Sequence, residues 1–210
     1  MLGPFCKDRL ELQLSGTTNG HDKDFAVDIL KASGLQTLRK FILIDDHLKL
    51  DIIRRGMGDG KGLVFFSCPN LKKIKTIQEN FIGKVNKIRG LAFSCRVPPQ
   101  LATRVGKVVR SSFSEYIKDN FIYNETNKCD KQSKGFGLAL VGETCNGQGE
   151  QIATFTVEAS VRPGDDTSPE ELGEQIVKKF STEMGFLGVV DSYSQPLLCA
   201  LIRKFGIFRR

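Results

Sequence analysis

Residues 87–116 have the sequence KIRGLAFSCRVPPQLATRVGKVVRSSFSEY, and the spacing of their apolar residues changes once. At first apolar residues alternate (Leu91, Phe93, Cys95), with the period of two that is typical of a β-strand. Pro98 and Pro99 end this strand, and proline is tolerated in the first turn of a helix. The next residues fall on one helical stripe: Leu101, Val105, Val108, Ser112 and Tyr116. This stretch therefore predicts a strand followed directly by an amphipathic helix.

The residues before this stretch predict a second unit that mixes strands and a helix. Leu10, Leu12 and Leu14 alternate with polar residues, as in a half-buried strand. A helical face follows, weakened by a glycine at 34: Phe25, Ile29, Ala32, Leu38 and Phe41. Residues 48–52 and 63–66 are two further strands, joined by a glycine-rich turn. We expect the order strand, helix, strand, strand over residues 10–68, with the helix on one face of the sheet.

The residues after it continue the same mixture. A short strand at 121–123 is followed by a polar loop over 124–134, and then come two strands, at 137–141 and 152–161. Ser168-Pro169-Glu170-Glu171 predicts a helix start, and a last helix is expected from Gln195 to Leu201. The whole chain is therefore predicted to have an α+β fold.

Positive charge is concentrated in the middle of the chain. Residues 71–110 contain ten lysines or arginines and one acid, Glu79, whereas the 210-residue chain has a formal net charge of +7. Such a local excess favours an anionic partner, of which nucleic acid is the commonest. The alternative, which the charge leaves open, is a solvated lysine-rich surface that keeps the protein in solution.

Cysteine usage and hydropathy limit the remaining classes. The six cysteines include no CxxC pair, and with only two histidines the chain has few ligands for zinc. Most of the cysteines lie in apolar runs, as buried reduced thiols do. No signal peptide or membrane-spanning run is recognisable. We expect a soluble protein of a reducing, intracellular compartment.

Three groups of cations are candidates for binding RNA or a partner protein. The first flanks the glycine-rich turn at 54–62, where four glycines could bring backbone amides to an anion, although turn geometry alone explains them better. The second lies in a linker, and the third on strand and helix surfaces, where a solvated face is an equally good explanation. The candidates are Arg54, Arg55, Lys61, Lys72, Lys73, Lys75, Arg89, Arg104, Lys107 and Arg110.

No catalytic or metal site is assembled by the remaining residues. His21 and His47 stand beside aspartates but are interpreted as surface histidines. Asp191, Ser192 and Ser194 are interpreted as a group that caps the last helix. Aromatic platforms for stacking bases are not expected, because the chain lacks tryptophan and its phenylalanines occur at core spacing.

The order of short motifs along the chain resembles the RNA 3′-terminal phosphate cyclase family, in particular its cyclase-like branch. Each motif is weak alone, but eight occur in the expected order. They are Leu2-Gly3-Pro4-Phe5, Gly16-Thr17-Thr18-Asn19, Ile53-Arg54-Arg55-Gly56-Met57, Phe66-Ser67-Cys68-Pro69, Ile88-Arg89-Gly90, Gly135-Phe136-Gly137-Leu138, Pro169-Glu170-Glu171-Leu172-Gly173 and Val190-Asp191-Ser192. The turn Gly58-Asp59-Gly60-Lys61-Gly62 departs from the family's usual Pro-x-Gly-Gly-Gly.

The resemblance implies a larger domain of βαββ units with a smaller α/β domain inserted between them. Residues 1–85 would form one βαββ unit plus a linker, residues 86–161 the inserted domain, and residues 162–210 the incomplete start of the next unit. By this comparison the chain looks like an internal fragment, truncated at both ends.

The resemblance also implies a function. Members of the cyclase-like branch are expected to be non-catalytic factors for early processing of small-subunit pre-rRNA in the nucleolus. They would bind a ribosome-biogenesis GTPase and RNA, and need no cofactor or metal. True cyclases use ATP to adenylate a histidine near the end of the fold, a region missing here, and neither His21 nor His47 falls at its position. An ATP-dependent RNA 3′-terminal phosphate cyclase and a pre-rRNA endonuclease remain the alternatives.

Overall fold

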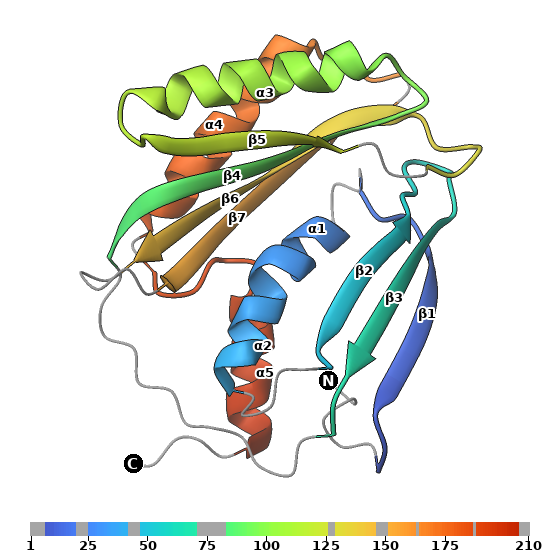
Figure 1. The fold of residues 1–210 in the computed structure, drawn as a ribbon, viewed down its shortest axis with the longest axis vertical. Helices are drawn as coiled ribbons and strands as arrows, with labels where there is room; N and C mark the ends of the chain where they lie inside the picture. The colour runs from blue at the N-terminus through green and yellow to red at the C-terminus, as the bar shows by residue number, and fades with distance from the viewer. Residues whose placement is uncertain are drawn as a thin grey trace.

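The structure, a computed structural model, describes residues 7–19, 25–41, 47–70, 83–125, 129–145, 151–162, 164–186 and 188–205. Two sheets make up its body, one of three strands and one of four, and each has helices against it (Figure 1). In this part of the chain, no helix combines the length and apolar composition that a membrane crossing needs. The α+β prediction is confirmed.

The first sheet contains the predicted strand, helix, strand, strand order. Its elements are β1 (Leu10–Gly16), α1 (Val27–Ile29), the π-helical turn η2 (Leu30–Gly34), α2 (Leu35–Phe41), β2 (Lys49–Arg54) and β3 (Gly62–Cys68). The strand order is β1-β3-β2, and both outer strands run antiparallel to β3. Leu35 of the helix packs on Leu48, Leu50 and Val64, so the helix covers one sheet face as expected.

The second sheet is built by the stretch quoted at the outset and the strands that follow it. Its strands and the helix between them are β4 (Lys84–Cys95), α3 (Pro99–Ser114), β5 (Asp119–Glu125), β6 (Gly135–Cys145) and β7 (Gln151–Val161). The order is β5-β4-β6-β7, with β4 and β5 parallel and the other pairs antiparallel. A helix between two parallel strands is the βαβ arrangement, and α3 therefore lies on one face of this sheet.

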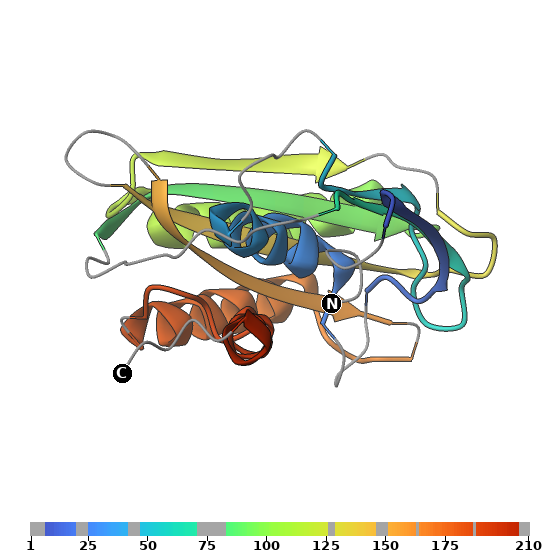
Figure 2. The ribbon, with the colours of Figure 1, turned by 90° about the horizontal axis from the view of Figure 1, so that it is seen from below.

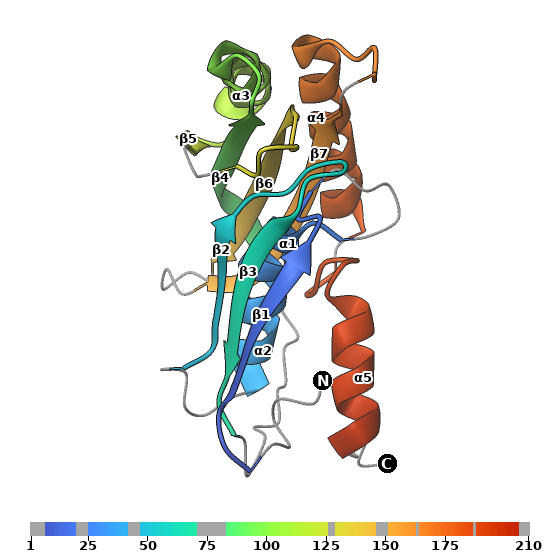
Figure 3. The same ribbon diagram turned by 90° about the vertical axis from the view of Figure 1, so that its right-hand side faces the viewer.

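Helix α4 (Pro169–Gly185) covers the same face beside α3 (Figures 1 and 3). Its start is the predicted capping box: the Ser168 hydroxyl accepts from the Glu171 amide, and the Glu171 carboxylate accepts from the Ser168 amide. The two helices approach closely at Gly173, where a Cβ atom would lie 2.8 Å from the Val108 side chain. The apolar face of α4 therefore packs on the second sheet, while the domain boundaries at 85/86 and 161/162 stay predictions.

The core of the second sheet confirms an amphipathic helix but corrects its predicted stripe. Val105 is buried as expected, whereas Ser112 is exposed and Tyr116, beyond the end of α3, is 81% exposed; the buried face continues instead through Val109 and Phe113. Val105 and Val109 of α3 are fully buried, together with Ile88 of β4 and Leu172, Ile176 and Phe180. Arg104, Lys107 and Arg110 face the solvent. The amphipathic pattern of α3 therefore positions the helix and leaves its basic side outward.

Helix α5 (Gln195–Phe205) follows the predicted capping group. Buried Asp191 accepts from the Ser194 amide at 2.9 Å and from the Thr156 hydroxyl of β7 at 2.6 Å. The Ser194 hydroxyl bonds to Ser33 of η2 at 2.6 Å instead of capping. Asp191 is thus the side chain that caps α5. Through Thr156, Asp191 connects the start of α5 to β7, and through Ser33, Ser194 connects it to η2.

Candidate functional site

Helix α3 presents the basic surface that the sequence predicts, but one of its three cations is already paired. Arg104 donates two hydrogen bonds to Glu170 at the start of α4, at 2.8 and 2.7 Å. This pair lowers the pKa of Glu170 and leaves Lys107 and Arg110 as the exposed cations of the helix. An exposed ion pair of this kind is weak and competes poorly with a phosphate.

Arg89 lies on β4 and is also paired. Its guanidinium donates to the Asp119 carboxylate at 2.8 Å, at the start of the neighbouring strand β5. Hydrogen bonding to Asp119 raises the pKa of Arg89, and burial opposes this effect. The side chain is 33% exposed, so it remains accessible from the solvent.

Arg55 contradicts the prediction of a surface cation. It is only 1% exposed, although its neighbour Arg54 has a side chain that is 43% exposed and lies 3.6 Å from Asp130. Lys61, on the same glycine-rich turn, is exposed. Arg55 is therefore unavailable to RNA or a partner, because strand β2 ends in a bridge to the loop after β5 and turns this side chain inward. Lys72, Lys73, Lys75 and His21 lie outside the described residues.

The Arg55 cluster, defined as Arg55, Asn19, Asp28, Glu125 and Glu158, occupies the junction of the two sheets. Arg55 donates to both Asp28 oxygens, at 2.6 and 3.2 Å, and binds the Glu125 carboxylate and the Asn19 side-chain oxygen. The Asn19 amide in turn donates to Asp28 at 2.7 Å and to Glu158 at 3.3 Å. The five side chains come from the β1–α1 connection, α1, the end of β2, β5 and β7.

Electrostatics within the cluster explain how three acids tolerate burial around one cation. Burial alone would lower the pKa of Arg55, but the charges and hydrogen bonds of Asp28 and Glu125 outweigh it, so the pKa is raised. Burial, together with the Asp28 charge, raises the pKa of Glu158 to about 7. Arg55 also lies 4.1 Å above the centre of the Phe93 ring, which adds a cation–π contact. The cluster is a network of hydrogen bonds and ion pairs that joins the two sheets.

The glycine-rich turn packs against the segment after β5, and four of its backbone amides are bonded within the protein. The Gly56 amide donates to the Thr18 hydroxyl, and the Met57 amide to the Ser133 hydroxyl. The amides of Gly60 and Lys61 donate to Met57 and to Asp130. Since protein groups already accept these bonds, the turn-geometry interpretation of the glycines is the one that the structure supports.

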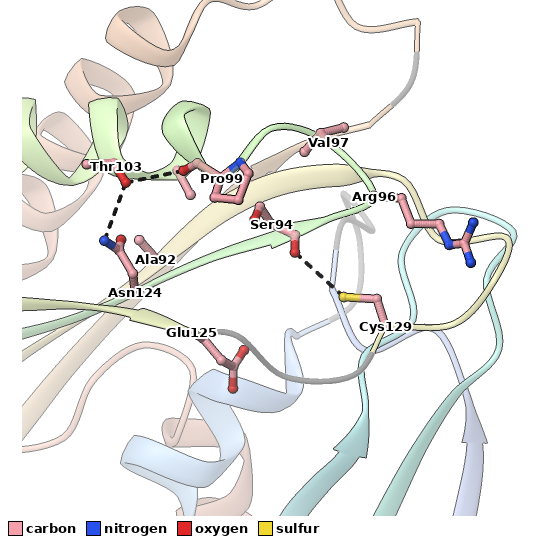
Figure 4. Close-up of a pocket in the computed structure, with 10 residues that line it drawn as sticks. Ala92, Ser94, Arg96, Val97, Pro99, Thr103, Asn124, Glu125 and Cys129 are labelled. Carbon is pink, nitrogen blue, oxygen red and sulfur yellow. Dashed lines mark hydrogen bonds between the residues drawn. The ribbon is translucent and has the colours of Figure 1, made fainter.

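A cavity of about 400 Å³ opens at the carboxyl ends of the parallel strands β4 and β5 (Figure 4). Ligands of α/β folds commonly bind at such strand ends. Its wall includes Arg96, which has a φ of 49°, and Thr103, whose hydroxyl accepts from the Asn124 amide at 3.4 Å. Glu125 also lines the cavity, but its carboxylate points toward the Arg55 cluster. Cys95 is the hydrogen-bond partner of Cys129 in the cavity wall, and burial together with this hydrogen bond raises the pKa of the Cys95 thiol. A thiol with a raised pKa is a poor nucleophile.

The remaining candidate residues fit their surface and structural interpretations. His47 accepts from Arg9 at 3.3 Å on an exposed surface. Within the described ranges, no three His, Cys, Asp or Glu side chains gather as a metal site would require.

Two aromatic side chains of β5 lie outside the core. Phe121 and Tyr123 are 45% and 52% exposed, and their ring centres lie 4.4 Å apart. The expectation that the phenylalanines occupy core positions is therefore wrong for this strand. The signal was present in the sequence, because these rings alternate with Ile122 and so must lie on the face opposite to it.

Comparisons with known proteins agree with this fold. Residues 82–184 match the family model of the insert domain of RNA 3′-terminal phosphate cyclase. An RNA 3′-terminal phosphate cyclase-like protein of Mus musculus is 40% identical over 96% of this chain and 54% of its own length. A probable cyclase-like protein of Drosophila melanogaster is 35% identical over 98% of this chain and 54% of its own length.

A third relative carries a name that refers to a process. It is an rRNA processing protein of Schizosaccharomyces pombe, 34% identical over 91% of this chain and 52% of its own length. The chain spans about half the length of the curated relatives it matches. With an insert-domain match on the second sheet and cyclase-like relatives along nearly all of its residues, the chain belongs to the RNA 3′-terminal phosphate cyclase family.

Proposed function

We propose that this protein is a non-catalytic ribosome-assembly factor that acts in early processing of small-subunit pre-rRNA in the nucleolus. It binds a ribosome-biogenesis GTPase and RNA. The observation that carries this proposal is the similarity, along 91% of the chain, to a relative named as an rRNA processing protein.

The surface charge supports contact with RNA. The β4–α3–β5 unit, residues 83–125, contains eight lysines or arginines and three acids, a formal net charge of +5. Lys107 and Arg110 stand on its outer helix without an acidic residue between Pro99 and Ser114. A cationic surface of this size is attracted to polyphosphate at ordinary ionic strength.

The internal pairing of the Arg55 cluster supports the non-catalytic part of the proposal. Catalytic acids and bases are usually held in a cleft with a perturbed pKa and a free side toward the substrate. Here the acid with the raised pKa, Glu158, bonds to Asn19, and Asn19 bonds to Asp28. These groups act on the protein's own architecture.

Charge reversal on α3 tests the RNA contact within this function. We expect Lys107→Glu with Arg110→Glu, in the intact protein, to reduce recovery of pre-rRNA and to delay its early cleavages. The matched control is Lys178→Glu with Lys179→Glu, an equal charge change on the exposed side of α4. For each lost phosphate contact, the slope of log K against log salt concentration should become less steep by ~0.7 for single-stranded RNA.

The wider function is tested by affinity purification of the intact protein from growing cells. Recovery of a GTPase and of pre-rRNA is the expected result, and recovery of neither would remove the proposal. Incubation with ATP and an RNA that ends in a 3′-phosphate separates the cyclase alternative, since a 2′,3′-cyclic end would show catalysis. Cleavage of a purified precursor by the protein alone would favour the endonuclease.

A further inference from the structure

The open face of the second sheet combines two exposed aromatic rings with two cations. Asp119, Phe121, Tyr123 and Glu125 share one face of β5, because side chains alternate along a strand. Ile122 points to the other face, where it packs against Gly90 and Gly106 under α3. The aromatic face is thus the side of the sheet away from α3 and α4.

The neighbouring strand adds the cations. In the parallel pairing of β4 and β5, Arg89 lies opposite Phe121, and Lys87 lies opposite Asp119. Arg89 is paired with Asp119 on the same face; their hydrogen bond is the main cause of the lowered pKa of Asp119, to which the charge of Lys87 adds. We call Phe121, Tyr123, Arg89 and Lys87 the β5 platform.

The platform lies at an edge of the molecule. Strand β5 is the outer strand of the sheet, and helix α1 contacts β7 at the opposite edge (Figures 1 and 2). The exposure of Phe121 and Tyr123, 45% and 52%, is high for large rings on a four-stranded sheet. The two rings are tilted by 60° to each other and form one continuous apolar surface.

We propose that the β5 platform binds single-stranded RNA by stacking unpaired bases on Phe121 and Tyr123, with Arg89 and Lys87 on the phosphates. Four-stranded sheets with helices on one face and aromatic rings on the other bind RNA in this way. Beside the rings stand Lys87 and Arg89 together with the acids Asp119 and Glu143, so an apolar protein partner would suit the rings but would bury these charged groups. Single-stranded RNA offers unpaired bases for the rings and phosphates for the cations at the same time. The proposal rests on the proposed function and names the form of RNA it contacts.

The first test measures RNA affinity directly. A fluorescein-labelled oligouridine, long enough to span the platform at roughly a dozen nucleotides, is titrated with the full chain and followed by fluorescence anisotropy. We expect Phe121→Ala with Tyr123→Ala to weaken binding about 30-fold or more, since losing each of the two stacks costs ~1–3 kcal/mol. The control is Phe186→Ala, which removes a ring that is 66% exposed at the end of α4 and should leave binding unchanged.

The second test keeps an aromatic ring in place and so does not depend on how well the alanine variant folds. The chain has no tryptophan, so Phe121→Trp introduces a single fluorescent reporter. A stacked base should quench its emission as the oligouridine saturates the protein, whereas Phe186→Trp should show no quenching. A duplex RNA of equal length should not quench either reporter, because its bases are already stacked.

Equal affinity of the double alanine variant and the wild type would overturn the platform, and so would a Phe121→Trp variant whose emission is unquenched at saturation. The outcome is separable from the proposed function. If the platform fails while the intact protein still recovers pre-rRNA, RNA is bound elsewhere and the assembly role stands. If the platform binds oligouridine but the protein is absent from pre-rRNA particles, the assembly role fails and the platform stands.

Discussion

Replacing Arg55 with methionine tests whether the Arg55 cluster holds the two sheets together. Arg55 is 1% exposed, and its partners Asp28 and Glu125 have side chains that are 6% and 13% exposed. Methionine keeps an unbranched chain but removes the charge, so both carboxylates remain buried without a cation. Removing one partner of a buried ion pair costs about 3–5 kcal/mol. We expect Arg55→Met to lower the free energy of unfolding by an amount near the top of that range, because two acids lose their partner.

The assay is urea denaturation followed by far-ultraviolet circular dichroism at pH 8 and at pH 5.5. Arg54→Met is the matched control, since that neighbouring side chain is 43% exposed and its pairing with Asp130 should contribute at most about 1 kcal/mol. The two pH values lie on either side of the raised pKa of Glu158, about 7, so the effect of Arg55→Met is compared with Glu158 protonated and with Glu158 ionised.

A further variant separates lost charge balance from lost packing. Combining Arg55→Met with Asp28→Asn and Glu125→Gln removes all three charges and should recover much of the stability, because no uncompensated charge remains buried. If the free energies of unfolding of Arg55→Met and Arg54→Met agree within about 1 kcal/mol at both pH values, the cluster does not hold the sheets together and the reasoning is refuted.

Three further predictions use the same denaturation series. The pKa of Glu158 is about 7 in the folded protein against an ordinary 4.5, so the stability contributed by its protonation is complete below pH 4.5 and is lost as the pH rises through 7. The free energy of unfolding of Glu158→Gln should therefore rise relative to that of the wild type by up to about 3 kcal/mol between pH 5 and pH 8. A difference between the two proteins that stays constant with pH would contradict this. Gly60→Ala should destabilise by about 1–3 kcal/mol, because its Cβ would lie 1.9 Å from the Ser133 hydroxyl and 2.9 Å from its Cα, whereas Gly16→Ala meets nothing within 4 Å and serves as control. Ser168→Ala should cost about 1 kcal/mol by removing the cap of α4, a loss that Ser181→Ala in the exposed middle of the same helix should not reproduce.

The elements were predictable where the pattern that defines them is local. The change from period two to the helical period within residues 87–116 placed β4 and α3, and the Ser168–Glu171 capping box placed the start of α4. Exposure of Lys107 and Arg110 followed from the same helical stripe. Binding of RNA or of a partner by these cations remains a prediction.

The candidate site was predicted less well, because burial depends on contacts between distant segments. Arg54 and Arg55 are adjacent cations in a turn, and nothing local distinguishes them. Arg55 is buried because α1, β5 and β7 deliver Asp28, Glu125 and Glu158 to the same place. The exposure of Phe121 and Tyr123 likewise depends on β5 being the outer strand of its sheet.

The amino-acid sequence by itself determined the order of strands and helices, the basic side of α3 and the family resemblance, since periodicity, capping and short motifs are properties of neighbouring residues. Only the tertiary structure decided which cations meet solvent, which acids share a proton-sensitive cluster and which rings lie open on a sheet. The physical reason is that desolvation and charge pairing are set by groups that are far apart in the chain and become neighbours only when the two sheets pack.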